Sequence, residues 1–173
     1  MIINIDKPVD WTSFDVVKKI RNVTKHKKVG HGGTLDPFAT GVLIIGTEKD
    51  TKKLSSITNL NKEYIAELKL GEATNTLDTE GKIVKESPVP IINEGLVNNV
   101  LKSFLGKQKQ VPPMFSAKKK NGTRLYKLAR KNIEVEREKN DIMINSICIN
   151  DLSRDKISFS VNCSKGTYIR VLG

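Results

Sequence analysis

Residues 30 to 43 read Gly30-His31-Gly32-Gly33-Thr34-Leu35-Asp36-Pro37-Phe38-Ala39-Thr40-Gly41-Val42-Leu43 and form the most informative stretch of the chain. The glycines permit backbone conformations with positive φ, and Pro37 pushes Asp36 toward an extended conformation. A short β-branched apolar run follows at residues 42–45, which is typical of a buried strand. The pattern therefore predicts a loop that holds Asp36 beside a core strand, where a rigid scaffold can aim a side chain.

Two other interpretations of residues 30–43 start from the same amino acids. Asp-Pro is a common turn former and the glycines permit turns, so local physics by itself favours a plain turn over a functional loop. A phosphate-binding P-loop would end in Gly-Lys-Ser or Gly-Lys-Thr and lead directly into a helix, and this stretch has neither feature. The P-loop is excluded, whereas the turn and the functional loop stay open on local grounds.

The charge balance indicates a polyanionic partner. The chain of 173 residues carries 30 Lys and Arg against 19 Asp and Glu, which gives a formal net charge of +11. At 38% hydrophobic residues and with mixed charge it is long enough to fold around a core. Because no amphipathic basic helix or lipidation motif stands out, we expect a nucleic acid rather than a membrane as the partner.

The cysteines and histidines suggest neither a disulfide framework nor a metal site. The chain has two of each, Cys148, Cys163, His26 and His31, and their spacing matches no metal-ligand pattern. The first residues follow a strand pattern, without a signal-peptide or transmembrane run. We therefore expect a cytoplasmic protein that needs no metal and no cofactor.

The hydrophobic pattern predicts strands and helices in alternation. We expect strands at residues 1–5, 42–45, 62–71, 133–137, 142–152 and 157–163, the last three as an antiparallel meander. One helix is expected after a cap at Thr12 or Ser13, with an inward stripe of Val16, Ile20 and Val23. Another is expected at 46–60, with Leu54 and Ile57 inward. A third begins after Asn93 and carries one apolar face, made of Leu96, Val97, Val100, Leu101, Phe104 and Leu105.

Two lysine clusters are candidate phosphate contacts. One comprises Lys25, Lys27 and Lys28, just before the Asp36 loop, and the other comprises residues 118–120, next to a turn signal at Asn121-Gly122. A run of charge is often only a solvated face. The position of the first cluster beside Asp36 favours contact with phosphates.

Residues 31–41 closely resemble the signature motif of the TruB-type tRNA pseudouridine synthases, the tRNA pseudouridine-55 synthase family. Lys7-Pro8 followed by Thr12-Ser13 resembles the first motif of that family, with Asp10-Trp11 in a spacer whose usual central residue is glycine. Further family segments are matched by residues 74–81, 110–130 and 163–172. The resemblance thus covers nearly the whole chain, in the right order.

The resemblance implies a fold, a domain organisation and an activity. It implies an α+β pseudouridine synthase fold, with a mixed, mostly antiparallel sheet flanked by helices and a central RNA-binding cleft. Residues 1–173 would form one catalytic domain, incomplete at its C-terminal end and without a PUA-type domain. The enzyme would be a monomer that isomerises the T-loop uridine at position 55 of tRNA, in the T-arm stem-loop, to pseudouridine.

The resemblance also assigns roles to seven residues. It makes Asp36, Tyr168 and Arg170 catalytic, with Arg170 holding Asp36 ionised. It makes His31, Tyr64, Lys7 and Asp78 substrate-binding, with Tyr64 stacking on the flipped base and His31 filling the space that the base leaves. From local sequence alone Tyr64 could equally be a core aromatic, Asp78 a turn residue and Arg170 an ordinary surface arginine.

Two other functions fit the composition. A non-catalytic RNA-binding module or tRNA-folding chaperone would need the same basic surface, although simple RNA binding does not require a carboxylate that faces a polyanion. A hydrolase that uses Asp36 is the weaker alternative, because no second catalytic carboxylate stands out.

Overall fold

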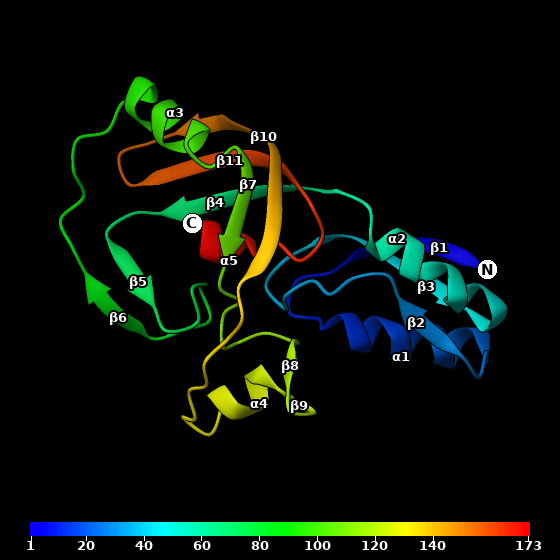
Figure 1. Cartoon of the computed structure of the whole chain (residues 1–173). Helices are drawn as coiled ribbons and strands as arrows, with labels where there is room; N and C mark the ends of the chain where they lie inside the picture. The colour runs from blue at the N-terminus through cyan, green and yellow to red at the C-terminus, as the bar shows by residue number, and fades with distance from the viewer. The chain divides into compact units, whose positions relative to one another are not determined.

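The computed structural model describes all 173 residues, Met1 to Gly173. The chain forms two compact units, Met1–Leu60 and Asn61–Gly173 (Figure 1). All paired strands in both units are antiparallel, and they form a three-stranded sheet, a four-stranded sheet and two short two-stranded ladders. The α+β class expected from the sequence is confirmed.

None of the helices has the length and hydrophobicity that crossing a bilayer would require.

The first unit packs one helix against a three-stranded sheet. The sheet has the order β1 (Ile2–Lys7), β3 (Gly41–Thr47), β2 (Val29–His31), and helix α1 spans Ser13–Thr24. Val16 and Val17 of the helix pack into one core with Leu43 and Ile45 of β3. Alternate side chains of a strand point to opposite faces, so Val42, in the strand predicted to be buried, is 69% exposed.

Helix α1 begins as its sequence predicts, but its buried face differs from the predicted apolar stripe. Thr12 is the N-cap: its side chain accepts a hydrogen bond from the backbone N–H of Asp15, whose carboxylate accepts one in return from the Thr12 N–H. The Thr12 hydroxyl also donates to the Asp15 carboxylate, and the bonds that the carboxylate accepts from this hydroxyl and from the Thr12 N–H lower the pKa of Asp15. Val17 joins the core, whereas Val23, predicted to face inward, lies in the last turn and is 67% exposed.

The helix predicted at residues 46–60 is shorter than expected. Gly46 still belongs to β3, where it pairs with Ile2 and Gly30. A 3₁₀ helix η1 follows at Glu48–Lys53, and α2 spans only Leu54–Thr58. A Cβ atom on Gly46 would lie 3.1 Å from the Asp50 carbonyl oxygen, so the close return of the chain over the strand favours glycine at this position. Leu54 is buried as predicted.

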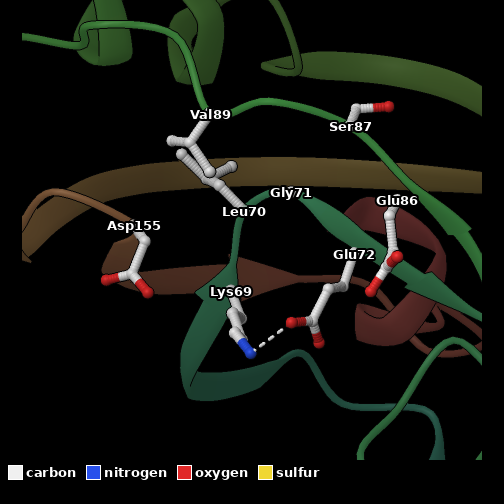
Figure 2. Close-up of a pocket in the computed structure, with 8 residues that line it drawn as sticks. All are labelled: Lys69, Leu70, Gly71, Glu72, Glu86, Ser87, Val89 and Asp155. Carbon is white, nitrogen blue, oxygen red and sulfur yellow. Dashed lines mark hydrogen bonds and ion pairs between the residues drawn. The ribbon is translucent and has the colours of Figure 1, made fainter.

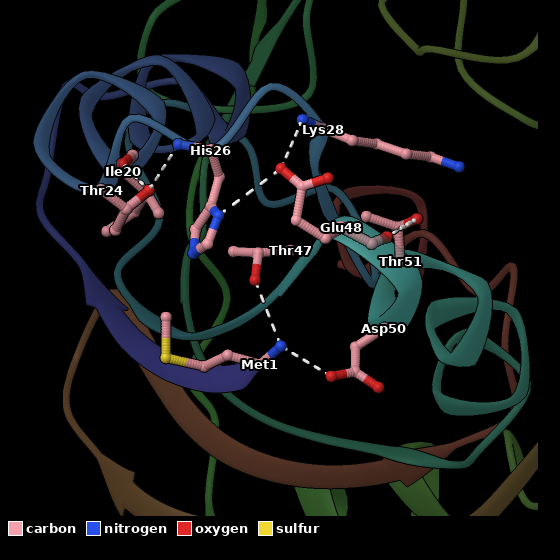
Figure 3. A network of polar contacts seen from close by, with 9 residues as sticks. All are labelled: Met1, Ile20, Thr24, His26, Lys28, Thr47, Glu48, Asp50 and Thr51. Atoms are coloured by element: carbon pink, nitrogen blue, oxygen red, sulfur yellow. Dashed lines mark hydrogen bonds and ion pairs between the residues drawn. The ribbon is translucent and has the colours of Figure 1, made fainter.

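A polar network joins β1, β3 and η1 (Figure 3). The amino group of Met1 donates to Thr47 Oγ1 at 3.2 Å and to Asp50 Oδ2 at 2.6 Å. Lys53 pairs with the other oxygen of Asp50 at 2.8 Å. Hydrogen bonds from Lys53 and from the amino group lower the pKa of Asp50 from 3.8 to about 2. The network therefore attaches the start of the chain to the segment that follows β3.

We expect the stabilisation from Asp50 to be lost in acid. Its pKa is lowered on folding, so its contribution is fully present above the unfolded pKa of 3.8 and disappears as the pH falls through about 2. The wild type should melt at a higher temperature than Asp50→Asn near neutral pH, and this gap should close toward pH ~2. Thermal melts of both proteins across this range test the expectation. A gap that stays constant with pH would contradict it.

The second unit is built on a four-stranded sheet in the order β4 (Lys62–Lys69), β11 (Lys156–Cys163), β10 (Asn140–Leu152), β7 (Gly106–Gln110). Its core contains Phe159 and Val161 of β11, and residues of α3 (Glu94–Lys102) and α5 (Ile169–Leu172) pack against it. The side chain of Asn93 caps α3 as predicted. Only Val97 and Leu101 of that helix are buried, so the apolar face predicted for it is too wide.

Two hairpins extend from this sheet. One pairs β5 (Glu72–Thr74) with β6 (Ile83–Glu86), and the other pairs β8 (Lys119–Lys120) with β9 (Thr123–Arg124) around the predicted Asn121-Gly122 turn. Helix α4 (Leu125–Ala129) follows directly. The strand predicted at residues 133–137 is wrong, because that segment has no regular structure. Both sides of β10 are already occupied, by β11 and β7, so the sheet offers this segment no place beside β10.

Candidate functional site

Asp36 lies in the first unit, half-buried on the loop that joins β2 to β3. The residue before it is anchored by the buried side chain of Ser13. The Leu35 N–H donates to Ser13 Oγ at 3.0 Å, and the Ser13 hydroxyl lies 3.3 Å from the Leu35 carbonyl oxygen. The start of helix α1 therefore holds the chain directly in front of Asp36.

The residue after Asp36 is held from the other side. The carbonyl oxygen of Pro37 accepts hydrogen bonds from the Asp10 N–H at 2.9 Å and from Lys7 Nζ at 3.0 Å. Asp36 itself begins a turn, because its carbonyl accepts the Ala39 N–H at 3.1 Å. These bonds fix the backbone on both sides of Asp36, which is one part of the preorganisation that a catalytic group needs.

Lys7 is completely buried, with 0% of its surface exposed. Besides Pro37, its ammonium donates to the carbonyl oxygens of Pro8 at 2.8 Å and Trp11 at 2.6 Å. An ammonium has three N–H donors, and three carbonyl acceptors surround this one. The resemblance makes Lys7 a substrate-binding residue. Its surroundings favour a positioning role, in which it ties the turn after β1 to the Asp36 loop.

Asp10 occupies the spacer position at which the resembling family has glycine. Its backbone is left-handed, with φ of 65°, a conformation that glycine adopts without strain and that aspartate tolerates better than most residues. Asp10 can therefore adopt the turn conformation that glycine would adopt at this position of the motif. The Asp10 N–H still reaches the Pro37 carbonyl.

His31 adjoins the Asp36 loop, whereas the first lysine cluster lies at the other end of β2, where the backbone of Lys28 bonds to Glu48 after β3. His31 ends β2, and its Nδ1 is hydrogen-bonded to the carbonyl of Gly33, which orients the ring over the start of the loop. Lys25, Lys27 and Lys28 are exposed on the segment before β2. In the second cluster Lys118 is engaged by Asn140 Oδ1 at 2.7 Å, whereas Lys119 and Lys120 are exposed. Both clusters contribute positive charge that could contact phosphates.

Arg170 lies in the second unit at the start of α5, and its side chain is only 8% exposed. Its Nη1 lies 3.3 Å from Asp78 Oδ2 and donates to the Thr76 carbonyl at 2.8 Å. Its Nη2 donates to the Phe115 carbonyl at 2.8 Å. The guanidinium therefore joins three segments that are distant in sequence, and it is not an ordinary surface arginine.

Asp78 is the centre of the loop that closes the β5–β6 hairpin. Its side chain is 6% exposed, and its Oδ1 accepts hydrogen bonds from the Thr76 hydroxyl at 2.6 Å and from the Glu80 N–H at 3.0 Å. The loop is so tight that a Cβ atom on Gly81 would lie 2.1 Å from Thr76 Oγ1. Because both oxygens of Asp78 are engaged inside the protein, its contacts favour a positioning role toward Arg170 over direct contact with substrate.

Tyr168 and Tyr64 are held differently. Gln110, at the end of β7, accepts the Tyr168 N–H at 2.8 Å and donates to the Tyr168 carbonyl at 3.1 Å, which clamps the backbone two residues before Arg170. Tyr64 pairs with Val161 across β4 and β11, and its ring packs partly against the core of the second unit. The structure thus places Tyr168, Arg170 and Asp78 together, while Tyr64 also has the core contacts that its strand pattern predicts.

A cavity of about 320 Å³ at the base of the β5–β6 hairpin is a poor candidate for RNA (Figure 2). Three carboxylates line it, those of Glu72, Glu86 and Asp155, and its lysine, Lys69, is paired with Glu72 at 2.5 Å. Like charges would repel a phosphate from this cavity.

Sequence reasoning missed three parts of the site. The sequence predicts a possible helix cap at Ser13, whereas in the structure the Ser13 hydroxyl anchors the Asp36 loop. Gln110 carries no motif at all. The pairing of Arg170 with Asp78 joins residues separated by more than half of the chain, and no periodic pattern marks such a contact.

Comparisons with known families give one match across most of the chain. The family described as "TruB family pseudouridylate synthase (N terminal domain)" matches residues 21–169. Curated relatives share about half of their residues with the chain. The tRNA pseudouridine synthase B of Clostridium tetani is 53% identical over 171 residues, and that of Geotalea uraniireducens is 46% identical over 168 residues. The chain spans 59% of the length of the first and 54% of the second, while nearly all of the chain is covered in both.

Solved structures resemble the chain over its whole length. A Cbf5-Nop10-Gar1 complex contains a chain with a TM-score of 0.72 and 29% identity, and the match covers 99% of this chain and 41% of that one. An H/ACA RNP bound to a substrate RNA containing 2′-deoxyuridine contains a chain with a TM-score of 0.69 and 26% identity, covering 99% of this chain and 40% of that one.

Proposed function

The chain belongs to the TruB family of pseudouridylate synthases, and from this membership we propose that it isomerises a uridine of tRNA to pseudouridine with Asp36 as the catalytic residue. The family match includes the whole Asp36 loop and reaches Tyr168. The observation that carries the proposal is the anchoring of that loop by Lys7, Asp10 and Ser13, which fixes the backbone around one carboxylate in a strongly basic chain. Simple RNA binding gives no reason for such a carboxylate.

The reaction needs a carboxylate and no oxidant. The bond between N1 of uracil and C1′ of the sugar breaks, the base turns, and a bond forms between C5 of the base and the same C1′. The proton on C5 is then lost and N1 gains one, so the substrate and the product have the same composition. We propose that Asp36 acts on the nucleotide as nucleophile or base, that Tyr168 packs against the flipped base, and that Tyr64 stacks on it.

His31 would fill the space that the base leaves, and Arg170 would favour the ionised carboxylate of Asp36. We further propose that residues 1–173 act as one catalytic domain of a monomeric cytoplasmic enzyme, with the T-loop uridine as the target. A stem-loop with the sequence of a tRNA T-arm and tritium at C5 of the target uridine tests the activity, because tritium is released only if the C5 proton is lost. Tight binding without release of tritium would favour the RNA-binding module instead.

We expect Arg170→Lys and Asp78→Asn to lower turnover in parallel. Lysine keeps the charge but loses the forked geometry that spans Asp78 and two carbonyls, and asparagine keeps the shape of Asp78 but removes its charge. A charge-assisted hydrogen bond contributes about 1.5–3 kcal/mol, which corresponds to a loss of about 10- to 150-fold. Single-turnover tritium release measures the loss, with Glu80→Gln in the same loop as the control. If both variants turn over as fast as the wild type, Arg170 and Asp78 do not contribute to catalysis.

At Tyr64 we expect RNA binding to depend on the aromatic ring and hardly at all on the hydroxyl group. Tyr64→Phe keeps the stacking face, whereas Tyr64→Leu should weaken RNA binding by about 1–3 kcal/mol, the scale of one stacked base. Tyr64 also packs against the core, so thermal melting of both variants separates lost stability from lost stacking. If Tyr64→Phe and Tyr64→Leu bind the RNA with the same Kd and are equally stable, Tyr64 has a role in the core and none in stacking on the RNA.

A further inference from the structure

The turn between β11 and α5 carries Tyr168 and leads directly to Arg170. Neighbouring strands hold both ends of this turn. At one end the Ser164 N–H donates to a backbone carbonyl of β10 at 2.9 Å, and at the other the buried side chain of Gln110 bonds to both the N–H and the carbonyl of Tyr168. The middle of the turn is Gly166, whose left-handed backbone has a φ of 79°. Its position depends on a third contact.

Asn140, the first residue of β10, supplies that contact. Its Nδ2 donates to the Gly166 carbonyl at 3.3 Å, and its Oδ1 accepts a hydrogen bond from Lys118 Nζ at 2.7 Å. Asn140 is paired with Gln110 in the ladder between β10 and β7, so the amide side chains of two paired residues reach the same turn (Figure 1). The Asn140 amide therefore connects the middle of the turn to Lys118.

Lys118 differs from the two lysines that follow it. Its side chain is half-buried, whereas Lys119 and Lys120 are exposed. Its carbonyl accepts the N–H of the buried Leu125 at 2.8 Å, at the base of the β8–β9 hairpin. The backbone and the ammonium of Lys118 are thus both engaged inside the second unit. A bond from an ammonium to an amide oxygen is charge-assisted, so it holds Asn140 more firmly than a neutral donor would.

The segment that ends at Lys118 also holds Arg170. The Phe115 carbonyl, in the middle of this segment, accepts Arg170 Nη2 at 2.8 Å. Gln110 begins the segment, and Lys118 at its end reaches the turn through Asn140. Contacts at both ends and in the middle of one segment therefore set the turn and the arginine that follows it.

From this geometry we infer that Lys118 and Asn140 are positioning residues, which hold the turn that presents Tyr168 and act on the reaction through it. The inference rests on the proposed function, in which Tyr168 packs against the flipped base. It gives Lys118 a different role from Lys119, whose exposed side chain can contact a phosphate. Loss of Lys118 should slow the reaction of bound RNA, whereas loss of Lys119 should weaken binding.

The test separates binding from turnover. The Kd for a stem-loop of the T-arm type and the rate of single-turnover tritium release at saturating enzyme are measured for Lys118→Met, Asn140→Leu, the double variant and Lys119→Met. The matched controls are Lys139→Met, which removes an exposed lysine next to Asn140 in the sequence, and Asn150→Leu, which removes an exposed asparagine near the other end of β10.

We expect Lys118→Met and Asn140→Leu each to slow tritium release by about 2- to 10-fold, the range that the net contribution of one hydrogen bond supports. The double variant should be no slower than the slower single variant, because both substitutions break the same connection. Lys118→Arg keeps a donor for Asn140 Oδ1 and should restore most of the rate. The Kd should rise less for Lys118→Met than for Lys119→Met, and the controls should react like the wild type.

A second variant at Asn140 tests the other half of the connection. Asn140→Asp keeps an acceptor for Lys118 but loses the donor to the Gly166 carbonyl, so it should be as slow as Asn140→Leu. Hydrogen exchange of residues 164–170 in the free protein reports on the turn without any reaction. Exchange should be faster in Lys118→Met and in both Asn140 variants than in the wild type and the controls.

Three outcomes would overturn the inference. They are losses of rate that add in the double variant, a defect of Lys118→Met confined to the Kd, and unchanged hydrogen exchange in residues 164–170. A wild type that binds the stem-loop and releases no tritium would instead refute the proposed function. In that case the exchange measurements still decide whether Lys118 and Asn140 hold the turn, so the two failures are distinguishable.

Discussion

Asp36→Asn is expected to abolish pseudouridine formation and to leave RNA binding intact or tighter. Asparagine has nearly the shape of aspartate and can keep the backbone contacts of Leu35, Pro37 and Ala39 that surround the position. What it removes is the negative charge, and with it the group that we propose as nucleophile or base. Removal of a negative charge also ends the repulsion between this side chain and the RNA phosphates, so affinity should not fall.

The measurement is tritium release together with the Kd for the same stem-loop. Asp6→Asn is a suitable control, because Asp6 is an exposed carboxylate in β1 that accepts the N–H of Gly41 at the far end of the same loop. We expect the control to retain most of the turnover and Asp36→Asn to retain none. Product formation by Asp36→Asn would make the catalytic assignment wrong and favour an RNA-binding module.

Lys7→Met is expected to destabilise the first unit by several kcal/mol, because each carbonyl left without its donor costs about 1–3 kcal/mol. Methionine fills a similar volume, but the carbonyls of Pro8, Trp11 and Pro37 would lose their shared donor. Because the Pro37 carbonyl is one of the three, the Asp36 loop should loosen as well. Turnover should fall together with stability.

Urea unfolding of the wild type, Lys7→Met and Lys19→Met tests this expectation. Lys19 is an exposed lysine on α1, so its substitution removes the same charge without a buried network and should change stability by less than about 0.5 kcal/mol. If the two variants unfold at the same urea concentration, the carbonyl cage around Lys7 contributes nothing.

Local sequence signals predicted the elements that depend on local interactions. The caps at Thr12 and Asn93, the Asn121-Gly122 turn and the alternating strand that contains Tyr64 are all confirmed, because each depends on residues a few positions apart. The strand predicted at residues 133–137 failed for the opposite reason. A strand needs a partner, and whether a sheet has a free neighbouring position is not written in the segment itself.

The residues that hold the site in place bond to partners far away in the sequence, so local sequence patterns do not predict them. Ser13 acts across 22 positions on Leu35, Lys7 across 30 positions on Pro37, and Gln110 across 58 positions on Tyr168. The contact between Arg170 and Asp78 is longer still. A motif can name Asp36 or Arg170 by resemblance, but which residues hold them is decided by the tertiary fold.

The order of these supports along the chain has a consequence for protein synthesis. Lys7, Asp10 and Ser13 all precede the loop that they anchor, and the strands on either side of it end by Thr47. Every partner of the Asp36 loop described above has therefore left the ribosome once the first unit has emerged. Because domains generally fold as units from the N-terminus during translation, this loop can reach its final shape while the segment that carries Tyr168 and Arg170 is still being made.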